Sequence, residues 1–357
     1  MLRAVTKDDG AVAIIAAVVI GFLSLALLSL TIDVGQMYAE RRELQNGADA
    51  AVIAVARELT ANPTLANSAA NTIAGQYAGK NALDTRSVGE AYGPVWGTHA
   101  PYSSSVYGIS APPAGPTTNY VEVRTATESS SGGPLDFFFH SGDATISAFA
   151  RAAWGSLGSY DGFPVSISVC EWNSATSDGT DYAPAGPYSS PSASLAPYER
   201  VLKLHTTSGT SCPSGPAGQD VPGGFGWLDH DGAGQVETEA GGTFSGDPGV
   251  SLDSELKPIL ANYWSTRQVI YLPIYNLVTG TGTNSHYRIE GYAAFVVTGY
   301  SLPGGNNKSW VTNKSLTTYP GIGGSDKVIS GFFTEALVSG TPGGSNFGVT
   351  TQPTLVR

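Results

Sequence analysis

The sequence is poor in charged side chains, which make up 13% of its 357 residues, about half the usual share of a globular protein. Glycine is abundant instead, with 45 residues, and proline contributes 22. Both residue types are typical of turns and are rare inside helices. An intrinsically disordered chain would have fewer aromatic residues and more charge. The composition therefore predicts an exported, β-rich globular protein with many turns.

Clusters of basic residues are also scarce. The formal net charge is -11, and no group of Lys and Arg follows Arg41-Arg42. Phosphate backbones are bound through clustered positive charge. We therefore expect no nucleic-acid partner.

Signatures of catalysis are missing as well. The chain contains neither H-E-x-x-H nor G-x-S-x-G, the motifs of zinc peptidases and serine hydrolases. The five histidines are scattered singly, without the spacing of metal ligands. We predict no catalytic residues, no cofactor and no metal site.

One segment partly matches a calcium-binding loop. Asp229 and Asp231 occupy positions 1 and 3 of such a loop, and Gly234 occupies position 6. Ala233 and Ala240 stand at positions 5 and 12, where a ligand side chain is needed. We favour an Asp/Gly-rich turn between strands, with calcium binding as the alternative.

Cysteine is nearly absent, with only Cys170 and Cys212. Two cysteines in an exported domain favour one disulfide. Closing a loop of about 40 residues would stabilise the fold by roughly 3–4 kcal/mol on the chain-entropy model. Two buried free thiols are the alternative.

The most conspicuous feature that is present is an uncharged apolar run over residues 11–32, AVAIIAAVVIGFLSLALLSLTI. As a helix it would be about 33 Å long, enough to cross a hydrocarbon core of about 30 Å. A cleaved signal peptide would have a shorter run and a small-residue cleavage site. We therefore expect a retained transmembrane helix, with residues 1–10 as a cytoplasmic tail and the remainder of the chain outside the cell membrane.

Small residues recur at intervals of four within this run, at Ala13, Ala17 and Gly21. Such a face lets another helix approach closely in a membrane. Ordinary alanine abundance explains the same pattern, so both interpretations stay open.

Residues 33–82 are predicted to form a helical stalk that continues the membrane helix. Apolar residues recur at three- and four-residue spacing on one face, including Leu44, Ala48, Ala51 and Val55. Asn62-Pro63 should end this helix, and a second helix is expected over 65–80. The apolar face could pack against other helices or fold back on the chain's own β domain.

The remaining chain reads as short strands separated by Ser, Gly and Pro. We divide it into a small β-rich domain over 83–155 and a Gly-rich β domain over 156–357 that holds both cysteines. Expected strands or short buried segments include 92–96, 120–125, 135–139, 145–153, 164–170, 201–204, 269–275, 287–300 and 328–338. The predicted fold class is α+β, a long N-terminal transmembrane helix followed by a β-rich, antiparallel exported region.

The N-terminal stretch resembles a known family. The residues that carry the resemblance follow the apolar run in the order Asp33-Val34-Gly35, Arg41-Arg42, Leu44-Gln45-Asn46 and Ala48-Asp49-Ala50-Ala51. They resemble the TadG-like N-terminal region of Flp (tight adherence) pilus-assembly proteins. The resemblance implies a membrane-anchored component of a Flp-type pilus system, with lipid and other pilus subunits as partners of the N-terminal helix.

The sequence departs from this family pattern in two ways. Pilins of the system carry Glu five residues after the processed glycine, but counting from Gly10 this position is Ile15. Some TadG-like proteins also carry a D-x-S-x-S metal motif, which this chain lacks. Neither prepilin processing nor metal-dependent adhesion is therefore carried over.

Three functions compete. The first is a non-enzymatic structural or assembly component of a Flp-type pilus. The second is a membrane-tethered adhesin or carbohydrate-binding β domain at the cell surface, whose aromatic residues could stack on sugars. The third, an anchored hydrolase, lacks any candidate nucleophile or acid cluster, so we favour the first.

Overall fold

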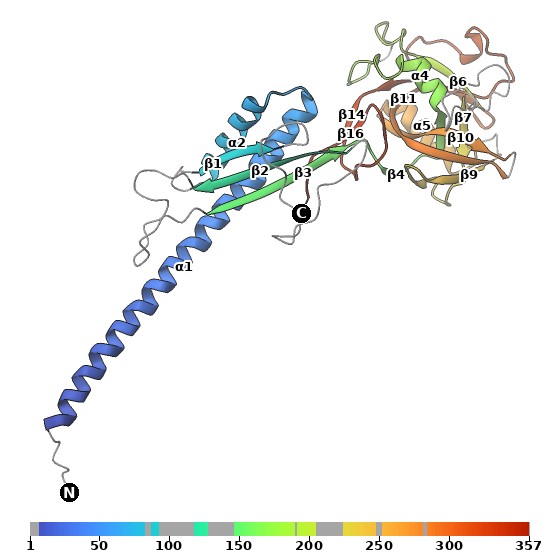
Figure 1. Ribbon diagram of the computed structural model, residues 1–357. Helices are drawn as coiled ribbons and strands as arrows, with labels where there is room; N and C mark the ends of the chain where they lie inside the picture. The colour runs from blue at the N-terminus through green and yellow to red at the C-terminus, as the bar shows by residue number, and fades with distance from the viewer. Residues whose placement is uncertain are drawn as a thin grey trace. The chain divides into compact units, whose positions relative to one another are not determined.

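The computed structural model describes residues 7–82, 87–92, 118–127, 146–189, 191–204, 224–247, 252–280 and 284–356. The described elements form two compact units (Figure 1). The first unit contains the N-terminal helices and a sheet that extends to Ala153, together with the chain segment from Pro353. The second unit runs from Trp154 to Gln352.

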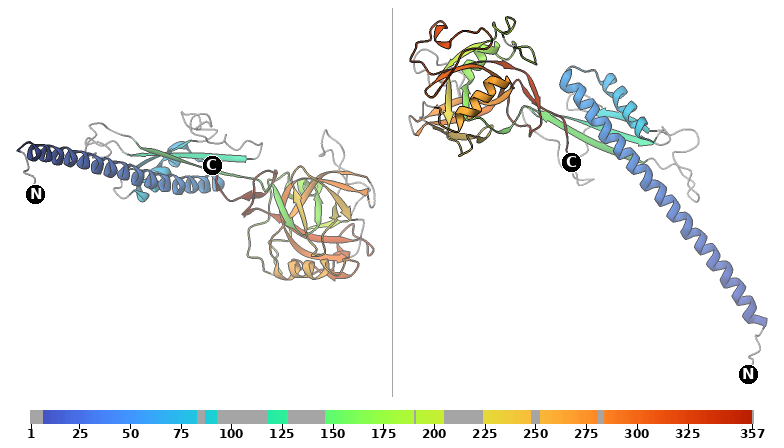
Figure 2. Two further views of the ribbon diagram at one scale, coloured as in Figure 1. Left: turned by 90° about the horizontal axis from the view of Figure 1, so that it is seen from below. Right: turned by 180° about the vertical axis from the view of Figure 1, so that it is seen from behind.

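Two helices begin the first unit, α1 (Lys7–Ala61) and α2 (Asn67–Asn81). Helix α1 has 55 residues, which corresponds to about 82 Å. It ends where predicted, because the ring of Pro63 disfavours helical geometry at the preceding residue. The N-terminal part of α1 extends away from the sheet, whereas its C-terminal part lies beside α2 and the sheet (Figures 1 and 2).

The sheet of the first unit has four strands in the order β1-β2-β3-β17. Their bounds are β1 Ser87–Tyr92, β2 Thr118–Thr127, β3 Ser147–Gly155 and β17 Thr354–Val356. Strand β1 pairs antiparallel with β2, and β17 pairs antiparallel with β3. The chain therefore returns from the second unit to complete the sheet of the first.

Very small residues allow the two helices and the sheet to approach closely. Ala74 and Ala78 of α2 are buried. A Cβ placed on Gly47 of α1 would lie 3.3 Å from the Ala78 Cα. A Cβ on Gly89 of β1 would lie 2.7 Å from the Ala74 carbonyl oxygen. The small alanine side chains of 65–80 thus allow the backbones to approach closely, and this matters more than the apolar volume that they bury.

The second unit is built on a nine-stranded sheet in which β10-β5-β7-β9-β11 form a closed ring, because β10 also pairs with β11. The ring strands are β5 Val165–Ser168, β7 Phe225–Leu228, β9 Thr243–Asp247, β10 Ile270–Thr279 and β11 His286–Leu302. Further strands attach to β11 or β13, namely β6 Arg200–Lys203, β12 Gly305–Asn307, β13 Val328–Thr334 and β15 Ser345–Phe347. Most pairings are antiparallel, although β10 with β5 and β11 with β15 are parallel.

Two smaller ladders complete this unit. Strand β4 (Ser159–Gly162) pairs with β8 (Val236–Glu239), and β14 (Ala336–Val338) pairs with β16 (Val349–Thr351). Strand β11 is the longest, with 17 residues, and most of it is buried. Its central segment YAAFVVTGY is buried throughout, as its almost unbroken apolar character predicts.

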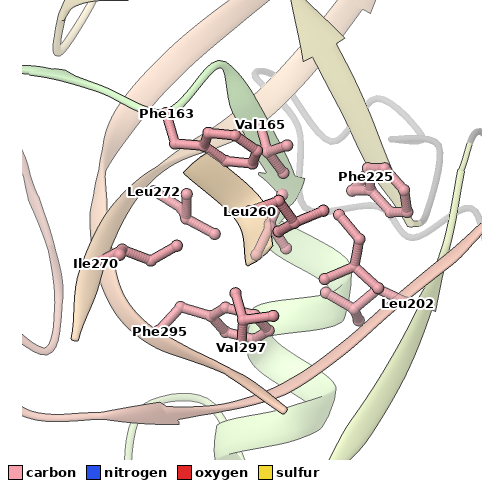
Figure 3. Close-up of a pocket in the computed structure, with 11 residues that line it drawn as sticks. Phe163, Val165, Leu202, Phe225, Leu260, Ile270, Leu272, Phe295 and Val297 are labelled. Atoms are coloured by element: carbon pink, nitrogen blue, oxygen red, sulfur yellow. The ribbon is translucent and has the colours of Figure 1, made fainter. Parts of the chain in front are cut away.

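Large apolar side chains fill the interior of the ring. Phe163, Leu260, Phe295 and their neighbours point toward one another (Figure 3). They leave a void of about 10 Å³ with a wholly apolar lining. A water needs polar partners as well as space, so this interior is a packed core and not a ligand site.

Two helices of the second unit differ from the sequence prediction. The strand expected over 164–170 ends at Ser168, where α4 (Val169–Thr176) begins. The Ser168 side chain accepts the Cys170 N–H at 3.2 Å, a helix N-cap that the apolar alternation concealed. Helix α5 (Leu256–Thr266) was not predicted, and it buries Leu256 and Leu260. A single 3-10 turn follows later at η3 (Leu316–Thr318).

The α+β class with antiparallel sheets is confirmed. The described part of the chain forms two units, and the predicted division at 82/83 falls within the first of them. The finer domain division stays a prediction. The segment expected over 135–139 and most of that over 92–96 lie outside the described residues.

Candidate membrane anchor and packing surface

The apolar run of α1 exposes its large side chains on every face. Their exposed fractions lie between 41% at Ile32 and 70% at Phe22. A helix at the surface of a soluble protein would bury one apolar stripe. In the described part of the chain, α1 is the one helix that is long and apolar enough to cross a membrane. Exposed apolar surface of this length fits a lipid environment.

The two hydroxyl groups near the end of the run are also compatible with lipid. Ser29 donates to the Ala26 carbonyl at 2.8 Å, and Thr31 donates to the Leu28 carbonyl at 2.6 Å. Polar groups inside a bilayer need partners within the protein. The helix backbone supplies them here, so neither hydroxyl opposes insertion.

The predicted small-residue face lies on this exposed part of the helix. Ala13, Ala17 and Gly21 are all exposed, and a Cβ added at Gly21 would meet no atom within 4 Å. The face is sterically open in the described structure. The packing of a second helix on this face stays a prediction.

The other predicted packing residues, Leu44, Ala48, Ala51 and Val55, are fully buried within the first unit. Leu44 packs with Ile146 and Ala148. A partner helix could reach this face only if the unit opened. The structure thus corresponds to the second of the two interpretations, in which the stalk packs on the chain's own β region.

Hydrogen bonds fix α1 against the sheet at this point. The Thr125 hydroxyl donates to the Leu44 carbonyl at 2.9 Å in a buried position. Gln45 Nε2 donates to the Phe149 carbonyl at 3.0 Å and to Asp49 Oδ1 at 2.8 Å. The residues Leu44-Gln45 of the family-like pattern therefore serve the fold of this chain directly.

The segment that partly matches a calcium-binding loop is a closed turn. Asp231 Oδ1 accepts the N–H groups of Ala233 and Gln235 at 2.9 and 3.0 Å. These bonds hold the pKa of Asp231 below its usual value. The described residues include no group of three or more His, Cys, Asp or Glu side chains that could hold a metal ion. The geometry favours the turn over a calcium site.

The predicted disulfide involves a residue outside the described part. Cys170 is partly buried in α4, and Cys212 is not among the described residues. The bridge between them stays a prediction.

A buried carboxylate that the sequence did not predict lies in the second unit. Glu199 is 8% exposed. It accepts hydroxyl hydrogen bonds from Thr298, Ser309 and Tyr319 at 2.5, 2.6 and 2.5 Å. The hydroxyls of Thr298 and Ser309 donate to Oε1 and that of Tyr319 donates to Oε2, so both buried oxygens have partners. The cluster ties the residue that precedes β6 to β11 and to the segment around η3.

Comparison with known families gives one match. Residues 10–58 match the Tad family model, described as TadE/G-like Flp pilus assembly. The match confirms the resemblance for the N-terminal region, which includes the apolar run and the stalk as far as residue 58. The comparisons with curated proteins and with solved structures give no match.

Proposed function

We propose that this protein is a single-pass, membrane-anchored structural or assembly component of a Flp-type pilus, without enzymatic activity. The N-terminus lies in the cytoplasm, and the chain that follows the apolar run of α1 lies outside the membrane. The observation that carries the proposal is the position of the exposed apolar segment of α1 inside the range 10–58 that matches the Tad family.

The geometry of α1 supports this role. Its apolar part is exposed and long enough to span a bilayer, whereas its continuation is buried in a folded unit. The unit is thereby fixed directly to the membrane helix, without a flexible linker between them. A rigid connection of this kind suits a protein that must hold a defined position during filament assembly.

Shearing of cells that carry a C-terminally tagged protein tests the role. We expect the protein either to leave with the sheared filaments, as a subunit, or to stay in membranes in a complex with pilus components. Purification from solubilised membranes, with and without shearing, distinguishes the two. Recovery without any pilus component in either fraction would contradict the proposal.

Helix contact with a partner is proposed for the small-residue face of the membrane segment. Because Leu44, Ala48, Ala51 and Val55 are buried, this face is the predicted packing surface that remains open. Cross-linking from a photoreactive group attached to the thiol of an Ala17→Cys variant should give an adduct with a pilus subunit or a second copy. Phe22→Cys, which lies off this face, is the control. Equal adducts from both variants would count against a specific face.

The orientation is tested through the predicted bridge between Cys170 and Cys212, which requires an oxidising compartment. Alkylation of the native protein before and after reduction should label both cysteines only after reduction. Labelling of both before reduction would contradict the bridge and remove one argument for the exported location.

A further inference from the structure

Two irregularities of strand pairing occur side by side in the second unit. Along β10 and β11, Ile274 pairs with Gly291, Tyr275 with Ile289, and Leu277 with Arg288. Asn276 and Glu290 are therefore skipped, one on each strand. Bulges of this kind redirect side chains and are frequent beside binding sites.

Both skipped residues line one cavity. The cavity measures about 290 Å³, and Arg288 also lines it. The remaining lining comes from the turn at Ala240-Gly241 and from the segment Gly343–Ser345. Its volume is at the lower end of the range of small-ligand sites, about 300–1,000 Å³.

Backbone hydrogen bonds hold the walls in place. The Gly241 N–H donates to the Ile289 carbonyl at 2.8 Å, and the Ile289 N–H donates to the Gly242 carbonyl at 3.0 Å. On the other side, Ser345 pairs with Gly291 through β15. A cavity with walls fixed in this way is preorganised, which reduces the entropy lost on binding.

The polar groups of the cavity are incompletely paired. Asn276 is 9% exposed, and its buried Oδ1 accepts no hydrogen bond from the described residues. Glu290 Oε1 accepts the Ser345 hydroxyl at 3.1 Å, which orients the carboxylate and leaves Oε2 for another donor. Buried amide groups usually have partners, and a half-rotation of the Asn276 amide can present either of its polar atoms.

The cavity is lined by one charge of each sign, Glu290 and Arg288. A charged ligand is attracted by one of them and repelled by the other, so neither sign of ligand charge is favoured by both. A hydroxyl group is both donor and acceptor. Adjacent hydroxyls of one ligand can therefore donate to the Glu290 carboxylate and to the Asn276 amide oxygen while they accept from the Arg288 guanidinium.

We propose that the cavity formed by Asn276, Arg288 and Glu290 binds a neutral, hydroxyl-rich ligand of the size of one sugar ring. This inference deepens the carbohydrate-binding alternative stated for the sequence and does not depend on the pilus role. Binding is measured on the purified chain, so its failure leaves the assembly role untouched.

Ligand-observed NMR on the full chain tests the proposal. The chain is held in a phospholipid nanodisc and not in detergent, because many detergents carry sugar head groups. The probes are neutral hexoses and N-acetylhexosamines at millimolar concentration, with inorganic phosphate and methylammonium as charged comparisons. We expect saturation transfer to at least one neutral sugar and none to the charged probes. Absence of transfer to every neutral sugar would overturn the proposal.

Matched variants locate the site. Asn276→Leu should weaken sugar binding at least about tenfold, the effect of an unmatched buried polar group. Glu290→Gln should also weaken it, because a carboxylate accepts a stronger hydrogen bond than an amide oxygen does. Asn262→Leu and Glu237→Gln, at exposed positions outside the cavity, should bind as the wild type does. Asn276→Leu should also melt no lower than the wild type, because it removes an unpaired buried oxygen. Unchanged binding in both cavity variants would refute this location.

Discussion

His230 connects the closed turn of Asp231 to the start of α5. Its Nδ1 contacts the Asp231 carbonyl at 2.7 Å, and its Nε2 contacts Asp253 Oδ2 at 3.0 Å. Asp253 Oδ1 in turn accepts the Leu256 N–H at 2.8 Å. Partial burial opposes the charged imidazolium, but the Asp231 carbonyl and the Asp253 carboxylate outweigh it, so the pKa of His230 is raised.

This raised pKa gives a pH dependence with a definite sign. The protonated form is favoured in the folded state. The stability that the His230–Asp253 contact contributes is therefore fully present below about pH 6.5, the usual pKa of His. It is lost as pH rises through the raised folded-state pKa. The effect should stay below about 1 kcal/mol because the pair is partly solvated.

The measurement is thermal unfolding of wild type and His230→Gln at pH 5.5 and pH 8. The gap in stability between the two proteins should be larger at the lower pH. His286→Gln serves as the control, because the described residues give His286 no carboxylate partner. An equal gap at both pH values would show that the ion pair is not formed.

Single residues also mark the limit of what the sequence predicts. The turn at Asp231 was predictable because its residues are neighbours in the chain. The Glu199 cluster was not, because its three hydroxyl donors lie 99, 110 and 120 residues away. The cavity at Asn276 and Glu290 depends on strand register, which a lone strand pattern does not determine.

At the scale of elements, the contact between α2 and β1 depends on glycine. A Cβ on Gly89 would come within 2.7 Å of the Ala74 carbonyl oxygen, whereas Gly75 has no neighbour nearer than 4.0 Å. Gly89→Ala should therefore destabilise the first unit by about 1–3 kcal/mol through overpacking. Gly75→Ala should stabilise it by about 0.5–1 kcal/mol, because alanine favours the helix.

Amide hydrogen exchange in α2 and β1 measures both changes, since protection reports local opening. Exchange should become faster in Gly89→Ala and slower in Gly75→Ala. A change of the same sign in both variants would mean that the two elements are not packed as closely as the distances indicate.

A buried ion-pair network joins β2 to β3 in the same sheet. Glu122 is completely buried and accepts from Arg124 and from Arg151, each at 2.9 Å. Removing one partner leaves an uncompensated buried charge, so Glu122→Ala should cost about 3–5 kcal/mol. Glu122→Met combined with Arg151→Leu should recover much of this loss, because apolar pairs replace buried ion pairs well.

Exchange protection in β2 and β3 reports the result. Asp326→Asn is the comparison, measured by exchange in β6, since the Asp326–Lys203 pair is partly exposed and its loss should have a much smaller effect there. If Glu122→Ala leaves the protection of the sheet unchanged, the carboxylate is solvated and the network does not hold the strands.

Elements differed in how well the sequence predicted them. The helices α1 and α2 were found because periodicity and Asn62-Pro63 define them locally. The bulk of β11 was found from its continuous apolar run. Strands of three to five residues such as β7, β8 and β15 carry too little pattern to be recognised. Helix α5 was missed because Pro258 stands within its first turn, a position that tolerates proline.

At the scale of the whole molecule, the chain combines an apolar helix with two folded units of low charge density. The long apolar helix required only local composition, so the sequence was sufficient to predict it. To predict what the apolar face of the stalk contacts, one would have to know the positions of residues far away in the chain. Ile146 and Ala148, which cover Leu44, lie about 100 residues from it. The sequence alone therefore left it open whether the apolar face of the stalk packs on other helices or on the chain's own β region.

Membrane anchoring gives the last prediction. Arg at the centre of a membrane helix costs about 2.5–3.5 kcal/mol, whereas Leu and Ile contribute about -0.5 kcal/mol each. Ile20→Arg combined with Leu23→Arg should therefore disfavour insertion by about 6 kcal/mol or more and release the protein from membranes. Met37→Arg with Tyr38→Arg, exposed positions beyond the run, should leave it anchored. Alkaline extraction of membranes measures both variants, and retention of the Ile20/Leu23 variant would mean that residues other than the apolar run of α1 hold the protein at the membrane.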